Sequence, residues 1–292
     1  MVIPSQQNEL SFSLERYELK YLIPSWLVEP ISDFLSPYCS LDKYSENSDD
    51  GYYPVKSLYF DTPGYLFLKK RRYGAASRIN MRVRAYGDAP GQPVFFEVKH
   101  KINHMVKKYR TPFFGENWPD ILNSPDTPWD GLMYSNLKTG PDLFIRLSHS
   151  YDATPKILTQ YRRKAYFSTI DDYARVTFDR DLQCQIQDEY KLTPDTYGMS
   201  NYDDASTFDP ETGVILELKC YCANVPLWML DLIRHFNLKR GRFSKYAAAM
   251  ETVFLSMGYS PCDRVASFDI SDADDPVYYQ SGTSSLLSSL RS

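Results

Sequence analysis

The chain of 292 residues lacks the short motifs that bind nucleotides or catalytic metals in many enzymes. It contains no Gly-Lys dipeptide, which excludes a phosphate-binding P-loop, and no GxGxxG, HExxH or HRD sequence. Its five cysteines form no CxxC pair and no even disulfide framework. Any binding of phosphate must therefore come from side chains.

Long apolar segments are also missing. No apolar run approaches the roughly 20 residues that a membrane-spanning helix needs. The opening sequence MVIPSQQNELSFS does not have the basic start and apolar stretch of a signal peptide. Unpaired cysteines fit a reducing compartment. We therefore expect a cytoplasmic protein with no membrane segment of its own, which leaves room for a membrane-protein partner.

Positive charge is not in excess over the whole chain. The 33 Lys and Arg residues are outnumbered by 37 Asp and Glu residues, for a formal net charge of -4. Acidic residues gather in segments such as SENSDD and NYDDAS, whereas basic residues lie inside apolar or β-branched runs. This distribution argues against a protein that coats nucleic acid and favours a focused anionic ligand in a cleft.

Basic residues recur at every second position of several predicted strands. Arg82 and Arg84 in INMRVRAY are the clearest pair. Side chains on a strand alternate between its two faces, so each pair projects to one side. Several such faces that converge on one lumen need an anion inside, because like charges repel unless something neutralises them. The pattern also includes Lys99, Lys108, Arg110 and Lys219, with Val83, Phe96, Val98, Tyr109 and Leu218 on the opposite faces.

Arg163 in YRRKAY and Arg175 in YARVTFD extend this pattern into a predicted hairpin. Arg175, Thr177 and Asp179 alternate along one strand and therefore share a face. A salt bridge to a neighbouring strand is the alternative to anion binding for Arg175.

The order of the predicted elements indicates an α+β fold built on a closed antiparallel sheet. Strands are predicted in LERYELKYLI, VKSLYFDTP and VILELKCY, three times between residues 77 and 112, and as a hairpin around IDDY. Helices are predicted at residues 25–34, in GYLFLKKRRYG and in two amphipathic segments before residue 257. We expect a flexible arm over residues 1–13, one domain over 14–262, and an acidic, Ser-rich disordered tail over 263–292.

Three glutamates each precede a lysine by two positions: Glu18, Glu97 and Glu217. Such a carboxylate either pairs with its lysine or holds a divalent cation against phosphate oxygens. Mn²⁺ and Mg²⁺ favour oxygen ligands and keep substrate phosphates in their shell, so one or two carboxylates suffice. Glu217 is the first candidate for a metal ligand, followed by Glu18 and Glu97, and salt bridging is the alternative for all three.

The segment GRFSKYAAAM offers an anion site at the start of a helix. Ser244 is a suitable N-cap for the helix that begins behind it. Backbone N–H groups at the helix start, the Ser244 hydroxyl and the Lys245 ammonium would together bind an anion. Capping alone accounts for Ser244, so the functional prediction depends on Lys245.

Several segments, in their order along the chain, resemble the VTC domain: ERYELKYLI, SLYFDTP, RVRAY, FFEVKHK, KKYR, YRRKAY, RVTFD, ILELK and FSKY. This domain is the polyphosphate polymerase module of the vacuolar transporter chaperone family, among the CYTH-like triphosphate tunnel metalloenzymes. The resemblance spans about residues 14–250 and implies an eight-stranded antiparallel barrel around a basic tunnel. It also implies transfer of the γ-phosphate of ATP to a growing polyphosphate chain. The residues implied to act on the phosphates are Lys20, Arg82, Arg84, Lys99, Arg163, Arg175 and Lys245, with Lys108, Arg110, Lys219 and Ser244 as further binding residues and Glu217 as the Mn²⁺ or Mg²⁺ ligand.

Two other functions stay open on the same scaffold. With water in place of the acceptor phosphate, the chain would hydrolyse triphosphate or short polyphosphates. Arg16 weakens that reading, because the related hydrolases start with an ExExK strand and Arg16 occupies its first carboxylate position. A module that only binds polyphosphate is the third possibility, but it gains little from Glu217 unless a metal lies there. The expected ligands are ATP and inorganic polyphosphate or triphosphate, without nucleic acid.

Overall fold

The structure is a computed structural model that describes residues 16–88, 91–103, 105–115, 117–123, 139–195, 198–203, 213–221, 224–241 and 243–258. The arm predicted over residues 1–13 and the tail predicted over 263–292 lie outside these ranges, as do Cys222 and Cys262. The cysteines within them, Cys39, Cys184 and Cys220, are buried free thiols. Among the helices in these ranges, none has the length and apolar character needed to cross a membrane.

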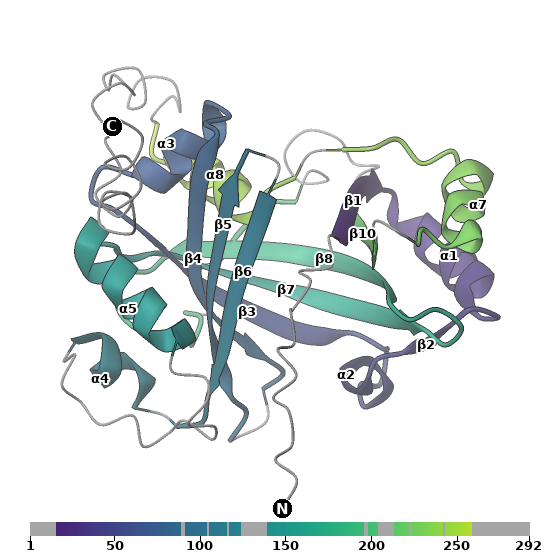
Figure 1. The fold of residues 1–292 in the computed structure, drawn as a ribbon, viewed down its shortest axis with the longest axis horizontal. Helices are drawn as coiled ribbons and strands as arrows, with labels where there is room; N and C mark the ends of the chain where they lie inside the picture. Colours follow the sequence, from purple (N-terminus) through teal and green to yellow (C-terminus); the bar gives the residue numbers. More distant parts are fainter. Residues whose placement is uncertain are drawn as a thin grey trace, which may run out of the picture. The chain divides into compact units, whose positions relative to one another are not determined.

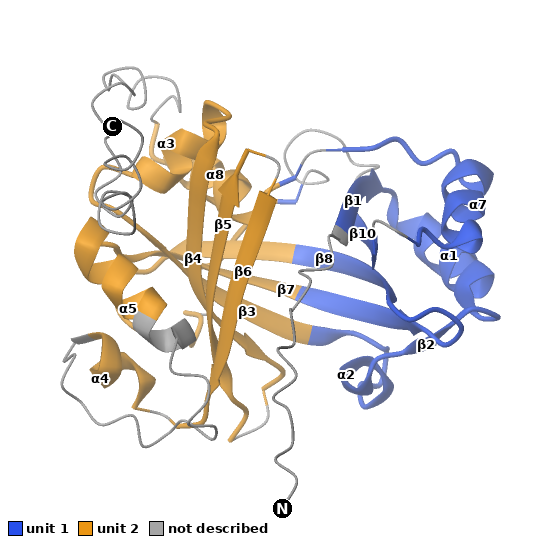
Figure 2. Ribbon diagram, in the orientation of Figure 1, with its two compact units in different colours: residues 1–53, 162–181, 203–243 blue, residues 54–161, 182–202, 244–292 orange. Residues whose placement is uncertain are grey.

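The chain folds into two compact units, which Figure 2 colours separately. Unit 1 comprises residues 1–53, 162–181 and 203–243, and unit 2 comprises residues 54–161, 182–202 and 244–292. Three strands contribute residues to both units: β3 (Tyr53–Asp61), β7 (Thr154–Ser168) and β8 (Ala174–Ile186).

The α+β class predicted from the sequence is confirmed, with antiparallel strand pairs throughout the registers described below. Eight strands follow the hydrogen-bonded order β1-β10-β8-β7-β3-β4-β5-β6, while β2 pairs with β7 and β9 pairs with β8. The order begins with β1 and ends with β6, and within the described residues no pairing between these two strands closes the sheet. Closure of the barrel therefore stays a prediction. The remaining strands are β1 (Arg16–Ile23), β2 (Cys39–Leu41), β4 (Ser77–Tyr86), β5 (Val94–Ile102), β6 (Met105–Phe113), β9 (Ser200–Asn201) and β10 (Val214–Tyr221).

Unit 1 packs two helices against the apolar face of β1, β10 and β8 (Figure 1). Leu218 of β10 lies opposite Val176 of β8, and both are fully buried. Helices α1 (Val28–Leu35) and α7 (Leu227–His235) cover this face, and the Trp228 side chain of α7 enters the core. Unit 1 also contains η1 (Ser25–Leu27) and α2 (Lys43–Glu46).

Unit 2 packs helices against the apolar face of β4, β5 and β6 (Figure 1). Val83 of β4 lies opposite Phe96 of β5, and the Phe96 ring meets Phe144 of α5 with centroids 5.3 Å apart. The predicted apolar positions Val83, Phe96 and Val98 are all buried in this core, and Tyr109 packs against it. The helices of unit 2 are α3 (Leu66–Arg72), α4 (Trp118–Asn123), α5 (Thr139–Tyr151) and α8 (Lys245–Ser256).

The two cores determine where the charged side chains lie. Because the apolar residues of each strand occupy the core face, the alternating positions carry their charges on the opposite face. The period-two pattern of the sequence therefore gives each unit one apolar face and one charged face, and the charged faces contain the predicted site residues of the strands.

Candidate functional site

In unit 2, the charged face of β4, β5 and β6 is arranged in rows across the strands. Arg82 lies opposite Glu97, which in turn lies opposite Arg110. In the next row, Lys99 lies opposite Lys108. The register thus brings predicted cations from three neighbouring strands onto one face. We call this set the cationic face: Arg82, Arg84, Glu97, Lys99, Lys108 and Arg110.

Glu97 lies at the centre of the cationic face and is only 2% exposed. Nε and Nη2 of Arg82 each lie 2.6 Å from its Oε2, and Lys108 Nζ and Arg110 Nε each lie 3.3 Å from its Oε1. Burial opposes ionisation of this carboxyl, but attraction by the surrounding cations, Arg82 and Arg84 foremost, outweighs burial and holds the pKa of Glu97 well below its usual range. Glu97 has the surroundings of an ion-pairing residue, the alternative to metal binding.

In Lys108, by contrast with Glu97, the surroundings disfavour the charged form. Removal of its ammonium from water lowers the pKa of Lys108, and repulsion by Arg82 and Arg84 adds to this against the attraction of Glu97, so that the pKa falls to about 8. The side chain is still 49% exposed, so an anion from solvent can reach it. Lys108 therefore loses part of its charge just above neutral pH unless a bound anion restores it.

Neutral side chains of β3 hold Arg82 and Arg84 in place. Arg84 Nε donates to Ser57 Oγ at 3.0 Å, and Arg82 Nη1 donates to Tyr59 Oη at 3.0 Å. Burial raises the pKa of Tyr59, but the charges of Arg82, Arg84 and Lys245 outweigh burial and lower it. Ser57 and Tyr59 were not among the predicted site residues, although the alternation in SLYFD places both on the face of the predicted cations.

The start of α8 adds the predicted residues Ser244 and Lys245 to unit 2. The Ser244 hydroxyl caps the helix by accepting from Ala247 N at 3.4 Å, which confirms its role as N-cap. Lys245 Nζ lies 4.5 Å from the ring centroid of Tyr161. Because the Lys245 charge also acts on Tyr59, it belongs to the same electrostatic environment as Arg82.

Asp61 connects this helix start to β3 and α3. Its buried carboxylate accepts from the backbone N–H groups of Phe67 and Leu68 and, at 2.6 Å, from the Tyr246 hydroxyl. The Tyr246 ring stacks on Tyr59, with centroids 5.2 Å apart. Burial raises the pKa of Asp61 despite these donors. Asp61 therefore fixes the Tyr246 ring, and Tyr246 in turn supports the Tyr59 ring beside Arg82. No sequence motif indicated this role.

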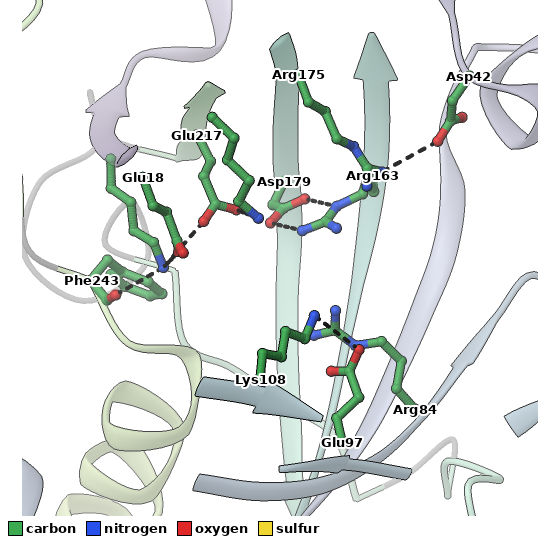
Figure 3. Close-up of polar contacts among 12 residues, drawn as sticks. Glu18, Asp42, Arg84, Glu97, Lys108, Arg163, Arg175, Asp179, Glu217 and Phe243 are labelled. Atoms are coloured by element: carbon green, nitrogen blue, oxygen red, sulfur yellow. Dashed lines mark hydrogen bonds and ion pairs between the residues drawn. The ribbon is translucent and has the colours of Figure 1, made fainter. Parts of the chain in front are cut away.

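In unit 1, the charged face of β1, β10 and β8, with Arg163 of the neighbouring β7, carries both signs. Lys20 Nζ lies 3.3 Å from Glu18 Oε1 and 3.7 Å from Glu217 Oε1, and Lys219 Nζ lies 3.3 Å from Glu217 Oε2. Glu18 and Glu217 thus converge on one ammonium group (Figure 3). We call this set the mixed face: Glu18, Lys20, Arg163, Arg175, Asp179, Glu217 and Lys219.

The carboxylates of Glu18 and Glu217 fit a divalent cation that shares its shell with phosphate oxygens. Among the residues that the structure describes, no group of three or more His, Cys, Asp or Glu side chains could hold a metal. Mg²⁺ and Mn²⁺ need only one or two carboxylates where phosphates complete the shell. Thr177, opposite Glu217, is 1% exposed, and its hydroxyl makes no hydrogen bond in the described part of the chain. An oxygen-rich ligand beside Glu217 would provide that hydroxyl with a partner.

Arg163 and Arg175 each contact a carboxylate. Arg163 donates from Nε and Nη2 to the two oxygens of Asp179, at 2.7 and 2.8 Å, and both side chains are buried (Figure 3). Arg175 Nη2 lies 3.4 Å from Asp42 Oδ2, which also accepts from Tyr53 Oη at 3.0 Å. The buried Nε of Arg175 makes no hydrogen bond to any described residue. The salt bridge considered for Arg175 is thus present, yet one of its donors stays available to an anion.

The predicted site residues fall into two groups, one in each unit. Apart from Ser244 and Lys245 at the start of α8, the structure gathers each group on one side of its strands, as the alternation predicted, but the ion-pair partners were not predictable from spacing. Asp42 and Tyr53 come from a segment without a motif, and Asp179 was recognised only as sharing a face with Arg175. In unit 2 lie Arg82, Arg84, Glu97, Lys99, Lys108, Arg110, Ser244 and Lys245, and in unit 1 lie Glu18, Lys20, Arg163, Arg175, Glu217 and Lys219.

One protein-family description matches most of the chain: the VTC domain, over residues 15–254. The protein "Vacuolar transporter chaperone complex subunit 4" of Trypanosoma brucei brucei (strain 927/4 GUTat10.1) is 22% identical over 270 residues, with 78% of this chain and 32% of that protein covered. The chain therefore spans about a third of the length of this curated relative.

Two solved structures are similar at low identity. A Bacillus halodurans protein described as a candidate adenylate cyclase is 12% identical with a TM-score of 0.43, covering 78% of this chain and 92% of that chain. A protein of Pyrococcus horikoshii OT3 is 10% identical with a TM-score of 0.40, covering 82% of this chain and 99% of that chain.

Proposed function

The chain belongs to the VTC domain family, and from this membership we propose that it is a metal-dependent polyphosphate polymerase that transfers the γ-phosphate of ATP to a growing polyphosphate chain. The cationic face is the observation that carries the proposal. Its Arg and Lys side chains lie on three neighbouring strands, and those of Arg82, Lys108 and Arg110 contact the buried carboxylate of Glu97. So much positive charge on one sheet face is best accounted for by a polyanionic ligand.

We further propose that the strands close into an eight-stranded barrel, so that the cationic face and the mixed face line one tunnel. A tunnel open at both ends would let the product chain leave without releasing its reacting end. ATP and inorganic polyphosphate are the ligands of this tunnel in the proposal.

The reaction requires positioning and charge neutralisation more than covalent help from the protein. Phosphoryl transfer passes through a loose transition state in which charge spreads over the equatorial oxygens. Arg82 and Arg84, held by Tyr59 and Ser57, present planar donors to those oxygens. The attacking group is a terminal phosphate oxygen that is already ionised, so no strong general base is needed.

The mixed face holds the metal and the adjacent phosphates. Glu217, with Glu18 beside it, would hold the Mn²⁺ or Mg²⁺ ion. A bound divalent cation neutralises phosphate oxygens during the transfer. With a metal on these carboxylates, Lys20 and Lys219 would be left to pair with phosphate oxygens. Asp179 keeps Arg163 in its orientation.

The proposal is tested with purified protein, ATP and Mn²⁺, assayed together for polyphosphate on a gel and for released phosphate. We expect metal-dependent chains in the wild type and a loss of turnover of at least about a hundredfold in Glu217→Gln, since the cation that neutralises the phosphate oxygens would lose its carboxylate ligand. Glu189→Gln is the matched control, because Glu189 forms an exposed ion pair with Lys191.

Two outcomes would replace the proposed reaction with another. Phosphate released from ATP and tripolyphosphate without any chains would identify a hydrolase on the same scaffold. Tight binding of labelled polyphosphate without turnover, unaffected by Glu217→Gln, would identify a binding module.

A further inference from the structure

Strands β4 and β5 continue the charged face of unit 2 beyond the residues assigned above. Arg78 lies directly opposite Lys101. The register is unbroken from Arg84 at one end of the strand pair to Ser77 at the other, so Arg78 and Lys101 share the face of Arg84. Ile79, the residue after Arg78 on β4, is buried in the core on the opposite face. The alternation of side chains and the burial of Ile79 thus both place Arg78 and Lys101 on the charged face.

The Arg78–Lys101 row contains like charges without a counter-charge. Among the described residues neither side chain makes an ion pair, in contrast to the cations around Glu97. Like charges directly opposite each other destabilise a strand pair. The preceding row also places like charges opposite each other, Lys99 and Lys108, although Lys108 contacts Glu97. Arg78 and Lys101 are both partly exposed, so an anion from solvent can reach them.

The row lies too far from Arg82 and Arg84 for a short ligand to contact all of them at once. Arg82 and Arg78 are four residues apart on β4, which corresponds to about 13 Å along a strand. A triphosphate seated at Arg82 and Arg84 ends before this row. A longer chain that follows the strands from there passes Lys99 and then meets Arg78 and Lys101.

We propose that Arg78 and Lys101 form a distal subsite for inorganic polyphosphate chains longer than triphosphate. This inference rests on the proposed function, since the short end of the same chain must bind at Arg82 and Arg84. Because both side chains are partly exposed, each contributes modestly and its contribution is screened by salt. The subsite makes the protein favour long chains over short ones.

The test compares dissociation constants for tripolyphosphate and for a long polyphosphate of defined length. The variant R78Q/K101Q should weaken long-chain binding about tenfold and reduce the slope of log K against log salt by about two, with tripolyphosphate binding changed less than about twofold. Lys107→Gln is the matched control and should change neither value. Lys107 is an exposed cation of the same hairpin, opposite His100 and therefore on the other face.

Each other outcome identifies which claim fails. Unchanged long-chain affinity in R78Q/K101Q, or an equal loss in Lys107→Gln, overturns the subsite. An RNA strand of matched charge that competes with the same dependence on Arg78 and Lys101 would assign the row to nucleic acid instead. A wild type that does not bind tripolyphosphate contradicts the proposed function and removes the inference with it.

Discussion

Glu97 and Lys108 are neighbours whose pKa values are both lowered, for different reasons. Four cations surround Glu97 and favour its charged form more strongly than burial disfavours it. In Lys108, burial and repulsion by Arg82 and Arg84 disfavour the ammonium more strongly than attraction by Glu97 favours it. A bound phosphate adds negative charge beside both residues. It therefore raises the pKa of Lys108 and makes this residue a reporter of anion binding.

Binding of tripolyphosphate should take up a proton on Lys108 near pH 8. In the free protein the pKa of Lys108 is about 8, so the ammonium is present below that pH and is lost as the pH rises through it. Affinity should therefore decline as the pH rises through 8. Titration calorimetry in two buffers of different ionisation enthalpy measures the proton uptake. Lys108→Arg, which stays charged, should bind without this uptake, and equal pH dependence in both proteins would contradict the assignment.

Tyr59 should affect binding, whereas Tyr246 should affect stability. Tyr59→Phe keeps the ring stacked on Tyr246 but removes the oxygen that accepts from Arg82, so we expect tripolyphosphate binding to weaken about fivefold at a cost in unfolding free energy of about 1 kcal/mol. Tyr246→Phe leaves the buried Asp61 without one donor, and we expect a cost of about 2 kcal/mol with little change in affinity. Thermal unfolding and binding titrations separate the two effects, and parallel losses in both variants would refute the distinction.

The stability of the three strands β4, β5 and β6 depends on Glu97. Cations from two of these strands, Arg82 of β4 and Arg110 of β6, contact its carboxylate on the third. Glu97→Gln should lower the free energy of unfolding by about 3 kcal/mol. Tripolyphosphate should raise the melting temperature of this variant more than that of the wild type, since the anion replaces the missing charge. Thermal unfolding at low salt, with and without the anion, makes the comparison. Equal responses of the two proteins would show that the cations do not need neutralising.

The pH dependence of this effect has a defined sign. The pKa of Glu97 in the folded protein lies below its unfolded value, so its contribution is fully present above the unfolded pKa of about 4.3 and is lost as the pH falls through the folded value. The stability difference between wild type and Glu97→Gln should therefore be constant from about pH 5 upward and should shrink only in stronger acid.

Strands in which apolar and charged residues alternate strictly were predictable from the sequence, because one side of such a strand faces the core and the other carries the charges. Val83 is buried between Arg82 and Arg84, as the pattern RVR requires. Helix α3 ends near Gly74, whose φ of +67° lies in the left-handed region that glycine favours. The strand β2 and the helix α2 were missed, because α2 is held by a cap at Asp42 and by contacts with β7, which is distant in sequence.

At the scale of the whole molecule, the sequence predicted which residues carry charge on the strand faces but not how those charges pair. The bond between Arg163 and Asp179 and the convergence of Glu18 and Glu217 on Lys20 depend on strand register, which period-two patterns leave open. The predicted site residues also divide between two units. The proposed tunnel requires residues of both units to act on the same phosphate chain.

Titration calorimetry of tripolyphosphate into the wild type, Arg84→Gln and Arg175→Gln tests this requirement most directly. Arg84 belongs to the cationic face of unit 2, and Arg175, whose buried Nε makes no hydrogen bond to a described residue, belongs to the mixed face of unit 1. We expect one ligand per protein and a loss of about tenfold in affinity for each variant, because each removes charge-assisted bonds to one chain. Two independent binding events, or a loss confined to one of the variants, would contradict a single tunnel that binds the chain through both faces.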